Sequence, residues 1–160
     1  MGGSIQFDIL GAAQLEARLA ALGLAAEGQE LLMGLARLGK SQTQRRISSE
    51  KTAPDGAAWL PNKAGGSTLF ATGDHLYDSI DEDVSGHTAR WGTGWIGAPV
   101  HQFGATIVPG NAKALAFKAG GKTVFAKKVV IPARPFLGVS DANTREIEAT
   151  ASRFIQMVLR

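Results

Sequence analysis

The stretch 27-EGQELLMGLARLGKSQTQRRISS-49 carries the longest regular pattern in the chain. Its leucines recur at helical spacing and share one face of a helix: Leu31, Leu32, Leu35 and Leu38. Acidic residues lie near the start of the stretch, and Arg45 and Arg46 near its end, an arrangement that suits the helix dipole. We therefore predict a long amphipathic helix over residues 27–49.

Two further helical patterns lie nearer the ends of the chain. Residues 12–24 place leucines at positions 15, 19 and 22, and Gly23 then interrupts the pattern. Residues 141–159 carry a clear apolar stripe, with Ser140 or Asp141 as its N-cap. The stripe consists of Ile147, Ala151, Phe154, Ile155 and Val158. We expect helices at both ends of the chain.

The middle of the chain changes to short strand patterns among glycines. Residues 84–96 predict two strands joined near Gly86, and residues 105–108 predict another strand. Residues 114–118 and 123–131 flank Gly120-Gly121, which predicts a hairpin over 114–131 with one wet face. Before these strands, residues 72–80 predict a helix cap followed by a short helical turn.

Helices that enclose β structure, without βαβ alternation, predict an α+β fold. We expect an antiparallel β-sheet with the long helices packed on one side. The 160 residues fit a single domain, divided into a helical part (1–49), an extended segment (50–70), a β-rich part (71–138) and a C-terminal helix (140–159). Trp59 and Leu60 would pin the extended segment, which is long enough to reach a neighbouring subunit.

Composition narrows the range of functions. The chain has no cysteine, which excludes disulfides, thiolate metal sites and a cysteine nucleophile. We see no apolar run long enough for a membrane helix and no export signal at the N-terminus, so we expect no membrane association. Glycine is abundant, with 20 residues, which indicates many turns and loops.

Charge is distributed unevenly although the net charge is only +3. The acidic block comprises Asp74, Asp78, Asp81, Glu82 and Asp83. A basic, acid-free stretch follows, with Lys113, Lys118, Lys122, Lys127, Lys128 and Arg134. These are either two solvated faces or complementary edges of neighbouring subunits. Non-specific contact between the lysines and DNA is a third possibility.

Residues 34–41, GLARLGKS, match the phosphate-binding P-loop pattern letter for letter. A working P-loop follows a buried strand and opens a helix, because its amide N–H groups must surround the phosphate. Here the leucine stripe runs through the motif, so those amides are expected to be bonded within a helix. We therefore expect no nucleotide site, although a nucleotide-dependent assembly factor is the alternative that this motif would support.

Other catalytic patterns are weak. His75, His87 and His101 are scattered and lack the spacing of a metal site. Asp74 and Asp78 lie four residues apart, but a solvated acidic cluster is the simpler interpretation. We expect no catalytic, cofactor-binding or metal-binding residue, and hence no enzyme.

Four segments together resemble the phage virion morphogenesis family, the Mu-like tail completion proteins. They are Pro54-Asp55-Gly56 with Trp59-Leu60-Pro61, the run 69-LFATGDHLYDSI-80, the run 100-VHQFG-104 and the run 131-IPARPFLGVS-140. The order and spacing match from the second helix onward, and the departure lies between residues 105 and 133, where the family often varies.

The resemblance implies a fold like that of tail terminators, with an extended arm, and a structural role in finishing the tail and joining it to the head. Related terminators form rings, commonly hexamers, so a homo-oligomeric ring contacting tail tube and head–tail connector or stopper proteins is implied. The protein would act without a cofactor and be assembled into virions in the host cytoplasm. Another connector or baseplate component with the same fold remains an alternative.

The motif residues have structural interpretations. Pro132 and Pro135 make a stiff connector that would aim Arg134 outward and Phe136 inward. Arg134 is either a buried clamp on carbonyls or carboxylates or a pair across the subunit boundary. In the run His101, Gln102, Phe103 and Gly104, we expect Phe103 in the core, His101 on a backbone carbonyl and Gly104 freeing the backbone. The candidate interface residues are Trp59, Asp78, Asp81, Lys127, Lys128 and Arg134.

Overall fold

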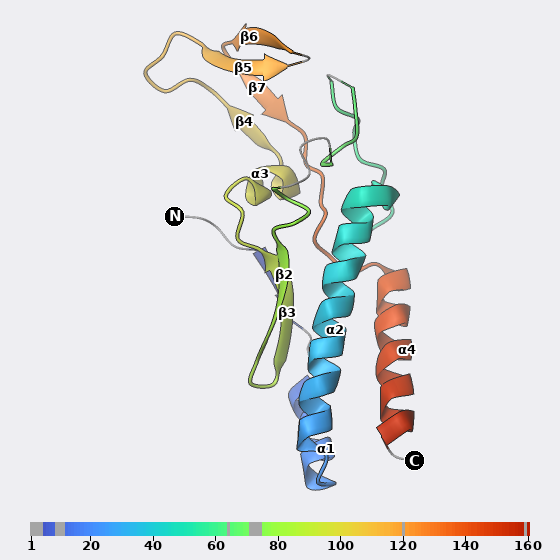
Figure 1. The fold of residues 1–160 in the computed structure, drawn as a ribbon. Coiled ribbons are helices and arrows are strands. Elements are labelled where there is room, and N and C mark those ends of the chain that lie inside the picture. The colour runs from blue at the N-terminus through green and yellow to red at the C-terminus, as the bar shows by residue number, and fades with distance from the viewer. Residues whose placement is uncertain (1–4, 9–11, 64, 71–74, 120, 159) are drawn as a thin grey trace.

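A computed structural model describes residues 5–8, 12–63, 65–70, 75–119, 121–158 and 160. Its helices are α1 (Ala12–Ala21), α2 (Ala25–Arg45), α3 (Ala98–Phe103) and α4 (Asp141–Val158), and a π-helical turn, η1 (Arg46–Glu50), extends α2 (Figure 1). The strands are β1 (Ile5–Asp8), β2 (Ile80–Ser85), β3 (Thr88–Thr93), β4 (Ala105–Ile107), β5 (Leu115–Ala119), β6 (Lys122–Ala126) and β7 (Val129–Ile131). The predicted α+β class is confirmed.

Helix α2 is the spine of the molecule, as its leucine stripe predicts. Leu31, Leu32 and Leu35 are buried, and η1 adds the fully buried Ile47. The helical run ends at Lys51, which adopts a left-handed conformation with φ of 57°. Its side-chain Nζ donates to the carbonyl of Ile47. This arrangement satisfies a helix-end carbonyl that would otherwise lack a partner.

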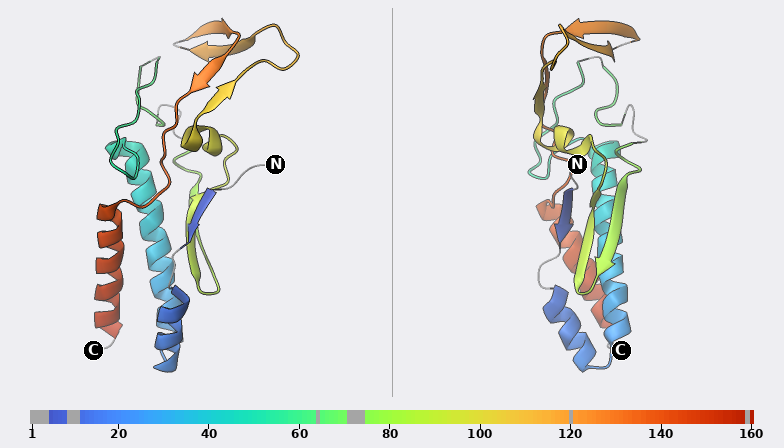
Figure 2. Two further views of the ribbon diagram at one scale, coloured as in Figure 1. Left: turned by 180° about the vertical axis from the view of Figure 1, so that it is seen from behind. Right: turned by 90° about the vertical axis from the view of Figure 1, so that its left-hand side faces the viewer.

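A three-stranded antiparallel sheet with the order β1-β3-β2 lies against α2 (Figures 1 and 2). The β2–β3 hairpin turns at Gly86, as predicted, and pairs Ile80 with Thr93 at its open end. Alternate residues of β3 are buried, including Ala89 and Trp91, because they face α2. Strand β1, which pairs with β3, was missed by the sequence interpretation of residues 1–49 as helical.

Helix α4 packs alongside α2, and its start is capped as predicted. The Asn143 amide N–H donates to Ser140 Oγ at 3.2 Å, and the Ser140 N–H donates to Asn143 Oδ1 at 3.3 Å. This reciprocal pair is a capping box with asparagine in the usual Glu or Gln position. The apolar stripe beyond it is only half-buried. The described residues therefore leave part of the apolar face of α4 exposed to solvent.

The segment 105–131 forms an arm that projects beyond α3, at the end of the molecule opposite the C-terminus (Figures 1 and 2). Strand β4 pairs with β7, and β5 pairs with β6, in two separate two-stranded ribbons. The hairpin predicted over 114–131 is therefore shorter. Its second strand ends at Ala126, and the following strand, β7, pairs with β4 instead. Both of its faces carry exposed side chains, so the single wet face was wrong.

Two smaller predictions also need correction. Residues 100–103, for which the sequence suggests a turn, belong to the short helix α3, which has a proline in its first turn. Residues 75–79 form turns rather than a helix, and Ile80 already belongs to β2. The predicted cap at residues 72–74 and the acid Asp74 lie outside the described residues.

Candidate assembly interface

The connector between β7 and α4 is held by side chains from distant segments. Gln102 is buried and bonds to it three times: Oε1 accepts from the N–H groups of Phe136 and Leu137, at 3.0 and 3.1 Å, and Nε2 donates to the Leu137 carbonyl at 3.0 Å. The side-chain amide of Gln102 thus makes the backbone hydrogen bonds that a neighbouring β-strand would otherwise make. The two most specific family-like segments, 101–104 and 131–140, are therefore parts of one structural unit.

Arg134 is buried, with 6% of its surface exposed. Its Nε donates to the Leu60 carbonyl at 2.9 Å and its Nη2 to the Pro61 carbonyl at 3.2 Å. Of the two interpretations left open, the structure shows the clamp on carbonyls, and the expectation that the connector aims Arg134 outward was wrong. Phe136 points inward, as expected, and is fully buried.

Trp59 pins the extended segment to the same connector, because its indole Nε1 donates to the Pro135 carbonyl at 3.1 Å. Trp59 is 8% exposed, whereas the neighbouring Leu60 is 62% exposed and is held only through its carbonyl, which accepts from Arg134. Both Trp59 and Arg134 therefore use their side chains inside the chain. Their assignment to a subunit interface stays a prediction, and with both side chains buried, any contact with a neighbouring subunit would involve the residues around them.

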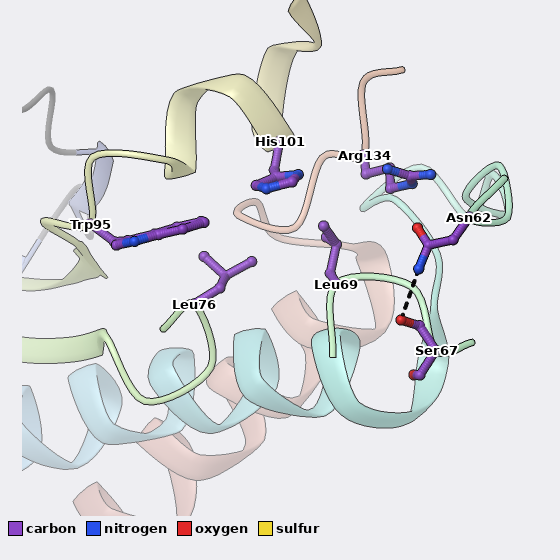
Figure 3. Close-up of a pocket in the computed structure, with 7 residues that line it drawn as sticks. All are labelled: Asn62, Ser67, Leu69, Leu76, Trp95, His101 and Arg134. Atoms are coloured by element: carbon purple, nitrogen blue, oxygen red, sulfur yellow. Dashed lines mark hydrogen bonds between the residues drawn. The ribbon is translucent and has the colours of Figure 1, made fainter. Parts of the chain in front are cut away.

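His101 and Trp95 line a cavity of about 110 Å³ together with Leu69, Leu76 and Arg134 (Figure 3). The two rings stack at 5.6 Å between centroids, and burial lowers the pKa of His101, helped by the nearby charge of Arg134. The predicted bond from the His101 side chain to a carbonyl is not formed, since its buried Nδ1 has no hydrogen-bond partner among the described residues. Instead, its own carbonyl accepts from the Arg134 N–H at 2.7 Å.

Phe103 was expected in the core and is 70% exposed. The reason is helical geometry: in α3, Ala98 and Gln102 share the inward face at a spacing of four, which turns Phe103 toward solvent. Gly104 has φ of 74°, and a Cβ there would lie 2.8 Å from the Ala133 nitrogen. A side chain is therefore excluded where this loop crosses the connector, in agreement with the predicted role of Gly104.

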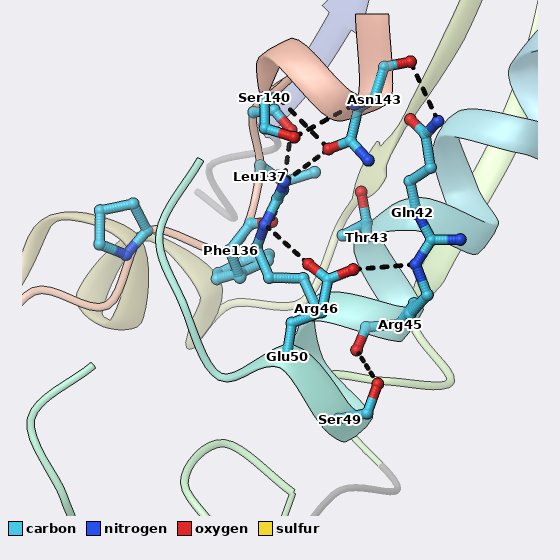
Figure 4. A network of polar contacts seen from close by, with 12 residues as sticks. Gln42, Thr43, Arg45, Arg46, Ser49, Glu50, Phe136, Leu137, Ser140 and Asn143 are labelled. Atoms are coloured by element: carbon cyan, nitrogen blue, oxygen red, sulfur yellow. Dashed lines mark hydrogen bonds and ion pairs between the residues drawn. The ribbon is translucent and has the colours of Figure 1, made fainter. Parts of the chain in front are cut away.

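Arg46 is the centre of a second set of clamps (Figure 4). The residue is 1% exposed; Nη1 donates to the carbonyls of Phe136 and Gly138, at 3.1 and 2.8 Å, and Nη2 donates to Asn143 Oδ1 at 2.6 Å. Burial lowers the pKa of Arg46, although a guanidinium stays charged in proteins. The sequence interpretation saw this arginine as part of a polar helix end, and it instead joins η1, the connector and α4.

Gln42 and Arg45 extend this network along the α2–α4 contact. Gln42 Nε2 donates to Glu146 Oε2 at 2.9 Å, and Arg45 binds the same carboxylate at 3.1 Å. The hydrogen bond from Arg45, followed by that from Gln42, lowers the pKa of Glu146. These contacts fix the N-terminal part of α4 on α2, which leaves its apolar stripe in a defined position.

The P-loop-like segment 34–41 lies inside α2, as expected, so its amides are bonded within the helix. Gly39 serves packing instead: a Cβ at this position would lie 2.5 Å from Trp91 Cε2. Lys40 bonds to Glu82 Oε2 at 2.6 Å and to Asp81 Oδ1 at 3.2 Å. Its ammonium therefore ties the helix to strand β2.

The acidic block is partly neutralised within the chain. Besides the two bonds from Lys40, Arg37 Nε lies 3.7 Å from Glu82 Oε1. Asp81 Oδ1 also accepts from the Glu82 N–H at 3.0 Å, which occupies a backbone donor of β2, the strand at one edge of the sheet. Asp78 and Asp83 remain exposed.

The arm carries the exposed apolar and basic side chains. Phe117 and Val124 face each other across the β5–β6 ribbon and are 38% and 36% exposed, and Phe125 on the other face is 71% exposed. Lys127 and Lys128 are exposed in the bend between β6 and β7. Strands β5 and β6 pair with each other and do not pack extensively on any other described helix or strand.

Neither a metal centre nor a membrane helix emerges from the described part of the chain. No group of three or more histidine, aspartate or glutamate side chains there is placed to hold a metal ion. No described helix is both long enough and apolar enough to cross a membrane.

The connector is clamped from three sides and the arm is left uncovered, which is typical of a structural subunit. The model of the phage virion morphogenesis family matches residues 11–156, so the chain belongs to that family. Its members have structural and assembly roles in the phage virion and are not a known enzyme family. No curated protein and no solved structure matches the chain.

Proposed function

We propose that this protein is the tail completion, or tail terminator, subunit of a tailed phage, and that it forms a homo-oligomeric ring, of six copies as in related terminators, at the neck that joins tail to head. Family membership supports the virion role. The observation that carries the ring is the arm, which exposes apolar side chains and has no extensive contact with the rest of the described chain.

An uncovered arm of this kind needs a partner for physical reasons. An isolated two-stranded ribbon is marginally stable in water, and its open strand edges and apolar side chains invite association. One face gathers the apolar side chains Leu115, Phe117, Val124 and Ala126 by the register of the β5–β6 pair. A second copy of the chain is the partner that is present at every position of an assembling ring.

The arm and the body are different surfaces, so contact of one copy's arm with the next copy's body is head-to-tail. Such contacts close into rings when the rotation between copies divides a full turn. The half-buried stripe of α4 and the exposed acids Asp78 and Asp83 are body surfaces that a neighbour could cover. Tail tube and head–tail connector or stopper proteins would then contact the two faces of the ring.

The test replaces the paired residues Phe117 and Val124 by serine in one variant. The matched control replaces Leu22 and Met157, each 63% exposed, by serine. Leu22 follows the last residue of α1 and Met157 is in the last turn of α4, and both helix ends lie opposite the arm (Figure 1). Native mass spectrometry reports the oligomer, and complementation of a phage lacking the gene product reports head–tail joining.

We expect the arm variant to lose both oligomers and joined particles while the control keeps both. Electron microscopy of labelled protein then locates the ring, and a position in the baseplate or the capsid would contradict the neck assignment. Normal assembly by the arm variant would contradict the arm as the subunit interface.

A further inference from the structure

The arm is basic without compensation. Residues 84–140 contain no aspartate or glutamate, and residues 105–131 contain five lysines, so the arm has a formal charge of +5. These are Lys113, Lys118, Lys122, Lys127 and Lys128. All five are exposed, and no ion pair joins any of them to a carboxylate within the described residues. No described carboxylate of this chain therefore neutralises the arm, which leaves it free to attract an anionic partner.

A second copy supplies too little counter-charge. The described acids of the block are Asp78, Asp81, Glu82 and Asp83. Two of these, Asp81 and Glu82, already share Arg37 and Lys40, so the block with its two bases has a formal charge of −2. The arm of a neighbour would bring more than twice that charge. The structure therefore favours a polyanion over an acidic patch of the same protein.

The dimensions of the ribbon suit duplex DNA. A five-residue strand is about 17 Å long, and 17 Å of duplex carries about ten phosphate charges. Lys118 and Lys122 lie next to the tight turn of the ribbon, while Lys127 and Lys128 lie at its base. Lysine is a flexible point charge that suits phosphate groups, and phosphate contacts carry no sequence information, so the set indicates binding that ignores sequence.

We propose that the lysines of the arm form a contact for the phosphate backbone of double-stranded DNA, independent of sequence. This goes beyond the ring and does not require it, because only Lys122 shares the apolar face with Phe117 and Val124. Lys113, Lys127 and Lys128 lie outside strands β5 and β6. Lys118 points to the opposite face from Phe117, since adjacent strand residues alternate sides. The arm can therefore bury one face on protein and keep lysines available for DNA.

The test uses the full chain and a fluorescein-labelled 30-base-pair duplex of mixed sequence, with fluorescence anisotropy measured from 50 to 200 mM salt. The arm variant replaces four lysines by glutamine: Lys118, Lys122, Lys127 and Lys128. A control variant makes the same change in net charge with glutamine at four exposed basic positions outside the arm: Arg18, Lys63, Arg145 and Arg153.

Each phosphate contact contributes about 0.9 to the slope of log affinity against log salt. Loss of four contacts would flatten the slope by about 3.6, equivalent to about 150-fold less salt-induced weakening over this fourfold range. We expect the arm variant to approach this value and the control to keep the parent slope. The proposal is overturned if the arm variant flattens the slope by less than about 1, or if both variants behave alike.

Polyglutamate serves as the competitor that separates nucleic acid from an acidic protein surface. Displacement of the duplex by polyglutamate at equal charge concentration would assign the arm to an acidic protein and overturn the DNA assignment. Resistance to it supports the duplex. The oligomeric state of both variants is measured in parallel, so a failed ring and a failed DNA contact give different results.

Discussion

Replacing Gly39 by alanine adds a methyl group where α2 meets β3, and Gly34 offers a matched comparison one and a half turns earlier in the same helix. Nothing lies within 4 Å of a Cβ at Gly34, whereas a Cβ at Gly39 would lie 2.5 Å from Cε2 and 2.6 Å from Cε3 of Trp91. The indole is 3% exposed and has little room to move. The same substitution should therefore have opposite effects at the two positions.

The magnitudes follow from two known terms. Alanine in a helix interior is better than glycine by about 0.8–1.0 kcal/mol, and both variants gain it. Overpacking of a core costs about 1–3 kcal/mol, and only the Gly39 variant incurs it. Because three ring atoms overlap, we expect the upper part of that range, with a difference of about 2–3 kcal/mol between the variants. For a chain of this size that is about 5–10 °C in Tm.

Urea unfolding at one protein concentration, followed by circular dichroism, measures both variants against the parent. A fixed concentration matters because assembly raises apparent stability. In a double-mutant cycle, Trp91→Phe should partly rescue Gly39→Ala, with a coupling of about 0.5–3 kcal/mol. Equal shifts for the two glycine variants, or a cycle without coupling, would refute the packing explanation.

Three further variants test the clamps. Gln102→Leu leaves two buried N–H groups and a carbonyl without partners, so it should cost at least about 2 kcal/mol in urea unfolding, and a loss under about 0.5 kcal/mol would contradict the clamp. Arg46→Met should cost about 3 kcal/mol by the same assay, since it strands buried acceptors on the connector and α4, and an unchanged midpoint would count against it. The Arg45 bond lowers the pKa of Glu146 in the folded state, so its contribution is complete above the unfolded value of about 4.5 and disappears as pH falls through the lower folded value. Glu146→Gln should thus lower the free energy of unfolding at pH 7 and much less at pH 2.5, and a gap that is independent of pH would refute this.

The long helices were predictable because their apolar residues repeat with the helical period. The inward Phe136 was predictable because it follows the stiff connector that Pro132 and Pro135 make. The arm was harder. Gly120-Gly121 announces the hairpin, but strand β7 leaves β6 because β4 offers it an antiparallel partner. This pairing brings together two strands about 25 residues apart in the sequence. The residue pattern within either strand alone does not indicate which strand it pairs with.

The clamps show the limit of local reasoning more sharply. The aromatic ring of Phe103 looked like the core residue of its motif, yet the polar Gln102 is buried because it can satisfy three backbone groups. The spacing of four from Ala98 was the signal that could have revealed it. For Arg134, the prolines fix an extended backbone, but its direction depends on carbonyls at residues 60 and 61, more than 70 residues earlier.

The guanidinium of Arg46 has a consequence for how this protein is made. Its acceptors lie 90, 92 and 97 residues further along the chain, so they leave the ribosome long after the arginine does. Until then the guanidinium has Glu50, whose carboxylate lies 4.0 Å from Nε in the folded chain, but it lacks all three hydrogen-bond acceptors, which disfavours early compaction. The unit that joins η1, the connector and the start of α4 can therefore form only after residue 143 has been synthesised.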